Sequence, residues 1–152
     1  MAYAKGTEVS PEKSRVEIEK LLVKMKATQH GVGFDNERAE AIIQFTIDKR
    51  QVSLRVAMPK RESFNKSRHG YFPTASKVDE LWQQAIREKW RGLLMVLKAK
   101  FIAIEQGVES FEQAFFYWLQ LPQGGTVGEH VMPAYREALQ HPTQKTLTAG
   151  TR

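Results

Sequence analysis

The sequence contains no cysteine among its 152 residues. Without a thiol, the chain cannot form a disulfide scaffold, a thiolate metal site or a cysteine nucleophile. Its four histidines are scattered and form no His-Glu-x-x-His motif, so a histidine-based metal site is not expected either. We therefore predict no metal and no other cofactor.

Long apolar runs are also missing from the sequence. No window approaches the ~18 uninterrupted apolar residues of a membrane-spanning helix, and Met1–Ser10 lacks the apolar segment of a secretory signal. We expect no membrane partner and a cytoplasmic protein, which the absence of cysteine also fits. A hydrophobic fraction of 41% is still enough to bury a core, so one folded domain is expected.

The first half of the chain predicts a helix followed by a sheet. Ser10 and Pro11 are typical of a helix start, and apolar side chains at helical spacing extend this helix to about residue 27. The apolar period changes to two over residues 39–47 and 51–58, which predicts an antiparallel hairpin. A preceding strand near residues 31–34 completes a three-stranded meander, which the helix covers on one face.

The second half of the chain predicts helices. From a cap at Ser76 and Asp79, apolar residues recur at helical spacing as far as Gly107. A helix of about 30 residues would be ~45 Å long at ~1.5 Å per residue, either as one continuous spine or broken near Gly92.

Capping boxes that begin at Ser110 and Thr126 predict two further helices. Pro133 is expected to kink or restart the last one, which ends at about residue 139. Residues 119–121, between these two helices, are compatible with a short strand.

The predicted fold class is therefore α+β: an N-terminal helix, a three-stranded antiparallel meander and a helical C-terminal half with one long helix. Residues 11–140 would form a single domain. A flexible N-terminus of residues 1–10 precedes this domain, and a polar, disordered tail of residues 141–152 follows it.

Catalytic motifs are absent. The glycines at positions 31, 33, 124 and 125 match neither a phosphate-binding loop nor a dinucleotide fingerprint, and no Gly-x-Ser-x-Gly nucleophile elbow is present. The order helix, three strands, helix is that of the PD-(D/E)xK nuclease core. However, the third strand, Gln51–Arg55, lacks the carboxylate needed to hold Mg²⁺. We predict no catalytic residue and a protein that is not an enzyme.

The net charge of +6 is concentrated in the middle of the chain. Residues 59–100 contain ten basic and four acidic side chains, whereas residues 1–58 carry a net +2 and residues 101–152 a net −2. A local excess of this kind creates a field that attracts a polyanion. A solubilising surface would have the same composition, and the sequence leaves the two alternatives open.

Residues 59–74 form a loop without periodicity, in which basic groups alternate with aromatic rings. Basic groups neutralise phosphates and exposed rings stack on unpaired bases, which are the two components of single-strand binding. Arg87, Arg91 and Lys98 of the following helix lie within ~40° of one another at ~100° per residue, so they form one basic stripe. The predicted nucleic-acid-binding residues are Lys60, Arg61, Lys66, Arg68, Tyr71, Phe72, Arg87, Arg91, Lys98 and, on the outward face of the third strand, Arg55.

Each of these features also has a purely structural interpretation. The rings of residues 64, 71 and 72 could anchor the loop on the core, and the polar outward face of the third strand could simply be solvated.

Residues 124–129 could form a backbone-amide nest for an anion at a helix N-terminus. A turn followed by a helix cap is the favoured interpretation of that segment.

Several separated segments form a further pattern. They are Ser14-Arg15-x-Glu17-Ile18-Glu19-Lys20-Leu21-Leu22, Gly31-x-Gly33-Phe34, Trp90-Arg91-Gly92-Leu93-Leu94, Lys98-Ala99-Lys100, Glu105-x-Gly107-Val108-x-Ser110-Phe111-Glu112 and Leu121-Pro122-x-Gly124-x-Thr126-Val127-Gly128-Glu129. In order and spacing they resemble a family of short, functionally uncharacterised proteins encoded in bacteriophage and prophage genomes, over most of residues 9–135. The resemblance implies a cytoplasmic protein of an infected bacterium and carries over no catalytic residue. Phage accessory proteins of this size often act in DNA replication and recombination, or against host defences.

Together, the residues and the resemblance predict a non-enzymatic protein that binds nucleic acid, single-stranded DNA above all, in phage replication or recombination. The alternative is an accessory protein that inhibits a host defence protein or sequesters a nucleotide signal. Its binding face would be residues 126–129 or an exposed patch at Trp82 or Trp118. The preference for DNA or RNA and the formation of a homo-oligomer are left open by the sequence.

Overall fold

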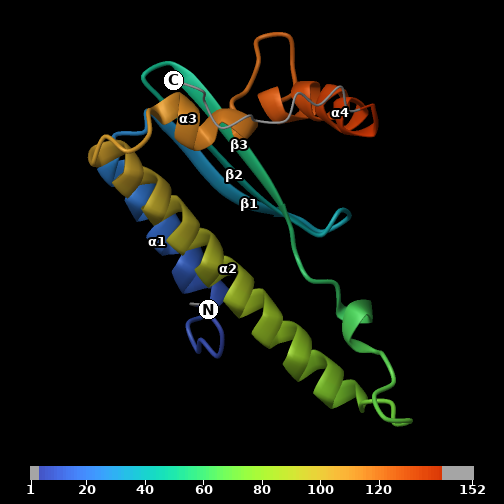
Figure 1. The fold of residues 1–152 in the computed structure, drawn as a ribbon. Coiled ribbons are helices and arrows are strands. Elements are labelled where there is room, and N and C mark those ends of the chain that lie inside the picture. Colours follow the sequence, from blue (N-terminus) through green and yellow to red (C-terminus); the bar gives the residue numbers. More distant parts are fainter. Residues whose placement is uncertain (1–3, 142–152) are drawn as a thin grey trace, which may run out of the picture.

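The structure is a computed structural model that describes residues 4–141. It confirms the α+β class, with an N-terminal helix, a three-stranded antiparallel sheet and a helical C-terminal half (Figure 1). Apart from His141, the predicted disordered tail lies outside the described residues. The elements are α1 (Pro11–Lys24), β1 (Gln29–Asp35), β2 (Glu40–Ile47), β3 (Arg50–Ala57), the 3₁₀ turn η1 (Arg61–Phe64), α2 (Ala75–Glu105), α3 (Phe111–Phe115), the 3₁₀ turn η2 (Phe116–Trp118) and α4 (Val127–Gln140).

Helix α1 begins as predicted but ends earlier. The Ser10 hydroxyl accepts a hydrogen bond from the Lys13 backbone N–H at 3.1 Å, and Pro11 occupies the first turn. The last helical residue is Lys24 rather than residue 27, because Lys26 adopts a left-handed φ of 63° that ends the helix. Its inner face buries Ile18 and Leu22 completely.

The sheet is the predicted meander in the order β1-β2-β3. The turn between β2 and β3 consists of Asp48 and Lys49, whose φ values of 48° and 64° are both positive, as a type I′ hairpin turn requires. The register places Gly31 opposite Gln44 and Gln44 opposite Ser53. These three residues therefore share the face of the sheet that points away from the core.

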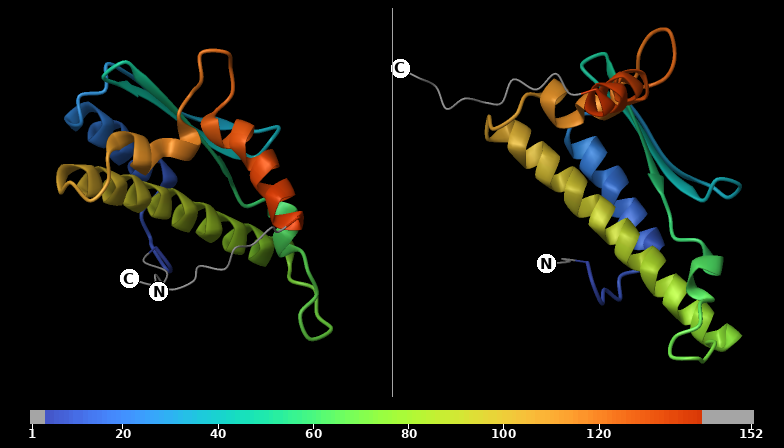
Figure 2. Two further views of the ribbon diagram at one scale, coloured as in Figure 1. Left: turned by 45° about the horizontal axis from the view of Figure 1, so that its top comes forward. Right: turned by 45° about the vertical axis from the view of Figure 1, so that its right-hand side comes forward.

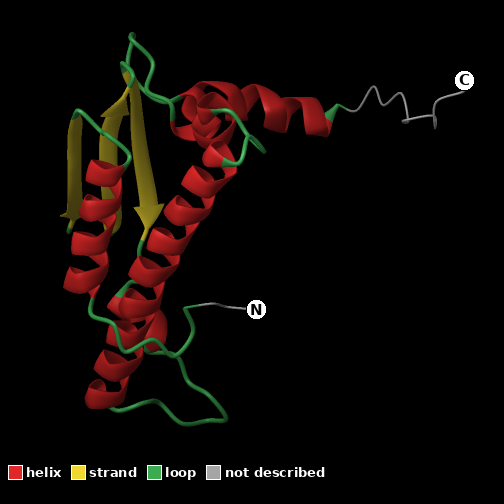
Figure 3. Cartoon of the chain, turned by 90° about the vertical axis from the view of Figure 1, so that its left-hand side faces the viewer, coloured by secondary structure: helices red, strands yellow, loops and turns green. Residues whose placement is uncertain are grey.

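Helix α2 is a continuous helix of 31 residues, without a break at Gly92. The cap predicted at Ser76 was wrong: Thr74 caps the helix, and its hydroxyl accepts from the Lys77 backbone N–H at 3.2 Å. Figure 3 shows α1 and α2 side by side against one face of the sheet. The N-terminal part of α2 extends beyond the strands to meet η1 (Figure 1).

The core lies between the inner sheet face and these helices. Phe45 of β2 is 2% exposed and packs against Phe101 of α2 and Phe115 of α3, with ring centroids 6.0 and 5.3 Å away. The predicted capping box at Ser110 is present and starts α3, whose Phe111 completes this aromatic cluster. The long C-terminal chain is thereby fixed to the sheet near its β2–β3 turn.

Residues 119 and 120 lie along the free edge of β3, joined to it by one isolated bridge rather than as a full strand. The Gln120 N–H donates to the Gln51 carbonyl at 2.8 Å, and Leu119 pairs with Val52. Helix α4 then leaves the body of the protein (Figure 2) and continues through Pro133 to Gln140 without an interruption.

Candidate functional site

The loop between β3 and α2 forms an exposed tip, defined here as residues 60–74. Within it, Arg68 and Tyr71 exchange two backbone hydrogen bonds of 2.9 and 3.0 Å. The two residues between them, His69 and Gly70, have φ values of 52° and 80°. Positive φ at both central positions is the hallmark of a type I′ hairpin turn. The tip thus holds a miniature hairpin at the end of the molecule.

The two rings that follow this turn face solvent. Tyr71 is 80% exposed and Phe72 is 73% exposed. The loop is anchored by other groups: the Trp82 indole N–H donates to the Pro59 carbonyl at 2.9 Å, and Phe64 is half-buried. Tyr71 and Phe72 therefore do not serve as core anchors for the loop.

The basic residues of the tip fall into two groups. The guanidinium of Arg61 meets the Asp79 carboxylate at 2.6 Å, and so fastens η1 to the first turns of α2. In contrast, the side chains of Lys60, Lys66 and Arg68 are exposed and make no ion pair within residues 4–141. These three cations lie in the same loop as the two exposed rings.

The basic stripe predicted on α2 is mostly engaged in the fold. Arg91 forms an ion pair of 2.5 Å with Glu17 of α1, and Arg87 donates two hydrogen bonds to the amide oxygen of Gln84. Lys98 is exposed, but 23 residues of helix separate it from Ala75, a distance of about 35 Å at ~1.5 Å per residue. The structure therefore does not bring the stripe and the tip together as one patch.

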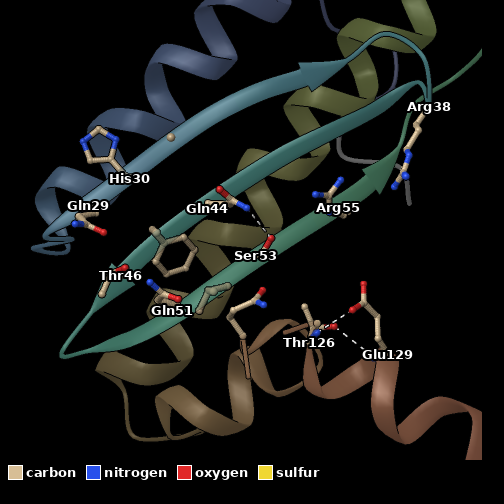
Figure 4. A pocket seen from close by; sticks show the side chains of 15 residues that line it. Gln29, His30, Arg38, Gln44, Thr46, Gln51, Ser53, Arg55, Thr126 and Glu129 are labelled. Carbon is tan, nitrogen blue, oxygen red and sulfur yellow. Dashed lines mark hydrogen bonds between the residues drawn. The ribbon is translucent and has the colours of Figure 1, made fainter. Parts of the chain in front are cut away.

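A cleft of about 750 Å³ opens on the outward face of the sheet (Figure 4). Gln51, Ser53 and Arg55, the polar strand face noted in the sequence, line it together with Thr126 and Glu129 from the start of α4. Arg55 lies 3.7 Å from the Glu40 carboxylate. Further lining residues come from β1, the β1–β2 turn, β2 and the bridging segment: Gln29, Arg38, Gln44, Thr46 and Gln120. No local sequence pattern marks them, because only the strand register brings them together.

The amides around Thr126 do not form a vacant anion nest. The Thr126 N–H donates to the Glu129 carboxylate at 2.9 Å, and the Glu129 N–H donates back to the Thr126 hydroxyl at 3.3 Å. The Gly124 N–H donates to the Leu121 carbonyl at 3.0 Å. The segment is the turn and capping box that the sequence favoured.

The alternative patches at Trp82 and Trp118 are not exposed surfaces. The indole of Trp82 is partly buried in its contact with Pro59, and Trp118 is partly buried against the core. The exposed rings of the C-terminal half are instead those of Phe116, Tyr117 and Tyr135, which are 55%, 40% and 54% exposed.

Two carboxyl groups have a lowered pKa, and in each case a hydrogen bond within the fold is the main cause. The Gly6 backbone N–H and the Gln84 side-chain amide lower the pKa of the Glu88 carboxyl, and Arg50 lowers the pKa of Glu112. Both carboxyls are on the surface and fasten segments of the chain.

Within residues 4–141, no group of three or more His, Asp and Glu side chains is arranged to hold a metal ion. No helix in this part of the chain has the length and apolarity to cross a membrane.

The sequence matches no protein-family model, and comparison with curated proteins and with solved structures gives no match either. The resemblance to phage-encoded proteins therefore stays a prediction from the sequence motifs alone.

Proposed function

We propose that this protein binds single-stranded nucleic acid through its tip, as part of phage DNA replication or recombination. The observation that carries the proposal is the exposure of Tyr71 and Phe72, at 80% and 73%, in the loop that holds the exposed cations Lys60, Lys66 and Arg68. Exposed rings provide stacking platforms for bases of any identity, and the cations bind the phosphates between them.

The binding surface in this proposal is smaller than the one predicted from the sequence. Arg61 and Arg91 already have carboxylate partners, and Arg55 lies next to Glu40. Releasing them would break ion pairs that fasten the fold, so we assign these three arginines a structural role. Arg87 and Lys98 lie outside the tip, 12 and 23 residues along α2 from Ala75, which corresponds to about 18 and 35 Å at ~1.5 Å per residue. A longer strand could reach them.

Fluorescence anisotropy with a labelled oligonucleotide tests the proposal. We expect Tyr71→Ala/Phe72→Ala to weaken binding by about 1–3 kcal/mol per lost stacking contact. The double variant Lys66→Ala/Arg68→Ala should weaken binding and reduce its salt dependence. The matched control Lys13→Ala/Lys20→Ala, which removes two exposed cations from α1, should bind as the wild type does.

The salt dependence of oligonucleotide binding measures how many phosphates the binding surface neutralises. Each neutralised phosphate of a single strand contributes about −0.7 to the slope of log K against log salt, so the three tip cations predict a slope of about −2. Engagement of all seven basic residues predicted in the loop and helix would give about −5. A flat salt response would contradict any electrostatic mode of binding.

A second candidate function, binding of a host protein, is favoured by the apolar side of α4. Val131, Tyr135 and Leu139 follow one another at intervals of four residues and are 47%, 54% and 58% exposed. The test is affinity capture from a nuclease-treated bacterial lysate. A stoichiometric partner that is lost with Val131→Asp/Tyr135→Asp, but retained with the tip variants, would support this candidate over nucleic-acid binding.

A further inference from the structure

The cleft on the outward face of the sheet has the size of a small-molecule site. Its volume of about 750 Å³ lies within the usual range for ligand pockets, ~300–1,000 Å³. Its floor is formed by β1, β2 and β3, and the start of α4 forms one wall (Figure 4). None of the tip residues lines it, so a ligand here would be independent of the tip.

One part of the cleft is lined by side-chain amides and hydroxyls. Gln44 donates to the hydroxyl of Ser53 at 3.2 Å, and Ser53 is only 6% exposed. The remaining members of this group are Gln29, Thr46, Gln51 and Gln120. A carboxamide offers a donor and an acceptor side by side, which matches the hydrogen-bonding edge of a nucleobase. This part of the cleft suits an uncharged, planar group with several donors and acceptors.

Two arginines line the other end of the cleft. Arg38, at the β1–β2 turn, and Arg55, on β3, are both directed toward this end (Figure 4). Arg55 is partly neutralised by Glu40 at 3.7 Å, whereas the Arg38 guanidinium has no ion pair within residues 4–141. A guanidinium binds a phosphate through paired N–H donors. The Glu129 carboxylate also lines the cleft, but it accepts the Thr126 backbone N–H of the capping box at 2.9 Å. The cation that is left for one anionic group is therefore Arg38.

Gly31 has no side chain, so the β1 side of the cleft floor consists of exposed backbone. A β-carbon built at this position would meet no atom within 4 Å, and the register places it on the same face as Gln44. A flat ligand can therefore lie directly on the backbone of β1. Gly33 has the same open surroundings and the same face, but it does not line the cleft.

From this arrangement we infer that the cleft binds one nucleotide unit. The base lies against the glutamines, and the phosphate binds Arg38. The unit is either a free mononucleotide or one residue of a strand, because both present the same base and phosphate. This site goes beyond the proposed tip function and does not depend on it.

NMR titration of the full chain with AMP, UMP, adenosine and ribose 5-phosphate tests the inference. We expect AMP or UMP to shift the side-chain amide signals of Gln44 and Gln51, and to bind at least tenfold tighter than adenosine or ribose 5-phosphate. Gly31→Val should weaken this binding at least tenfold by filling the floor, since valine suits a strand and meets no neighbour. Gly33→Val is the matched control and should bind as the wild type does. Arg38→Gln should remove the preference for AMP over adenosine.

An oligonucleotide titration separates the two sources of the ligand. If only the oligonucleotide shifts these amides, and Gly31→Val abolishes the shifts, the unit belongs to a strand. If no probe shifts them, or if the shifts persist in Gly31→Val, the inference is wrong. Tyr71→Ala/Phe72→Ala distinguishes this result from failure at the tip: it should weaken binding of the oligonucleotide and leave binding of the mononucleotide unchanged.

Discussion

The guanidinium of Arg91 on α2 lies 2.5 Å from the carboxylate of Glu17 on α1, and this ion pair joins the two helices that cover the sheet. The two side chains are 24% and 29% exposed, so water screens their attraction only in part. A residue that sequence periodicity placed in a phosphate-binding stripe thus has a structural partner 74 positions away.

We expect the Arg91–Glu17 pair to stabilise the fold by a modest amount. A double-mutant cycle of Glu17→Ala and Arg91→Ala should give a coupling free energy of about 0.2–1 kcal/mol, measured by urea unfolding and reduced at high salt. Oligonucleotide affinity should be the same in Arg91→Ala and in the wild type. A loss of affinity comparable to that of Lys66→Ala/Arg68→Ala would show that Arg91 contacts the nucleic acid after all.

Gly128 determines how closely α4 approaches η2. It is buried, and a β-carbon at this position would overlap the ring of Tyr117. Gly128→Ala should therefore destabilise the protein by about 1–3 kcal/mol through overpacking, as measured by urea unfolding. In a Tyr117→Ala background the same change should become neutral or stabilising, because the ring is gone.

Gly92 is the matched control for this prediction. It lies inside α2, and a β-carbon added there would meet nothing within 4 Å, so Gly92→Ala should stabilise the helix by about 0.5–1 kcal/mol. Equal stabilisation by Gly128→Ala would contradict the close packing of α4 on Tyr117.

Most of the fold could be predicted from local sequence signals. The period of two in β2 and β3, the cap at Ser10 and the capping boxes at Ser110 and Thr126 each depend on neighbouring residues, and each was confirmed. The errors were at helix boundaries, namely the end of α1 and the start of α2. The cap of α2 is at Thr74 rather than Ser76, because both are good capping residues and only the path of the preceding loop selects between them.

The functional surfaces were harder to predict, because they depend on which groups meet in space. No local pattern shows that Arg61 pairs with Asp79 or that Arg91 pairs with Glu17. Similarly, the glutamines of the cleft are spread from Gln29 to Gln120, and only the sheet register and the bridge at β3 bring them together. The exposed rings at the tip were recognisable because the sequence places them in one continuous loop.

The carboxylate of Glu88 fastens the N-terminal segment to α2. It accepts the Gly6 backbone N–H at 2.9 Å, and this bond, followed by that from Gln84, lowers the pKa of Glu88 below its usual value of 4.5. A carboxyl with a lowered pKa stabilises the folded state above its unfolded pKa, and the contribution is lost as the pH falls through the folded pKa. We expect the NMR amide signal of Gly6 to titrate with a midpoint below 4.5 and to show no such titration in Glu88→Gln. A midpoint at or above 4.5 would contradict a net lowering of the pKa of Glu88 by these hydrogen bonds.

The turn at His69 and Gly70 controls where the rings of Tyr71 and Phe72 project. Because both turn residues have positive φ, 52° and 80°, the backbone disfavours a β-branched side chain at either position. Gly70→Val should therefore distort the hairpin and weaken oligonucleotide binding by about as much as the loss of one stacking ring, roughly 1–3 kcal/mol, although it removes no proposed contact. His69→Asn should leave binding unchanged or tighten it, since Asn-Gly is the preferred pair for a type I′ turn. Anisotropy titrations of both variants at one salt concentration make the comparison. Wild-type affinity in Gly70→Val would show that the hairpin does not position the rings for binding.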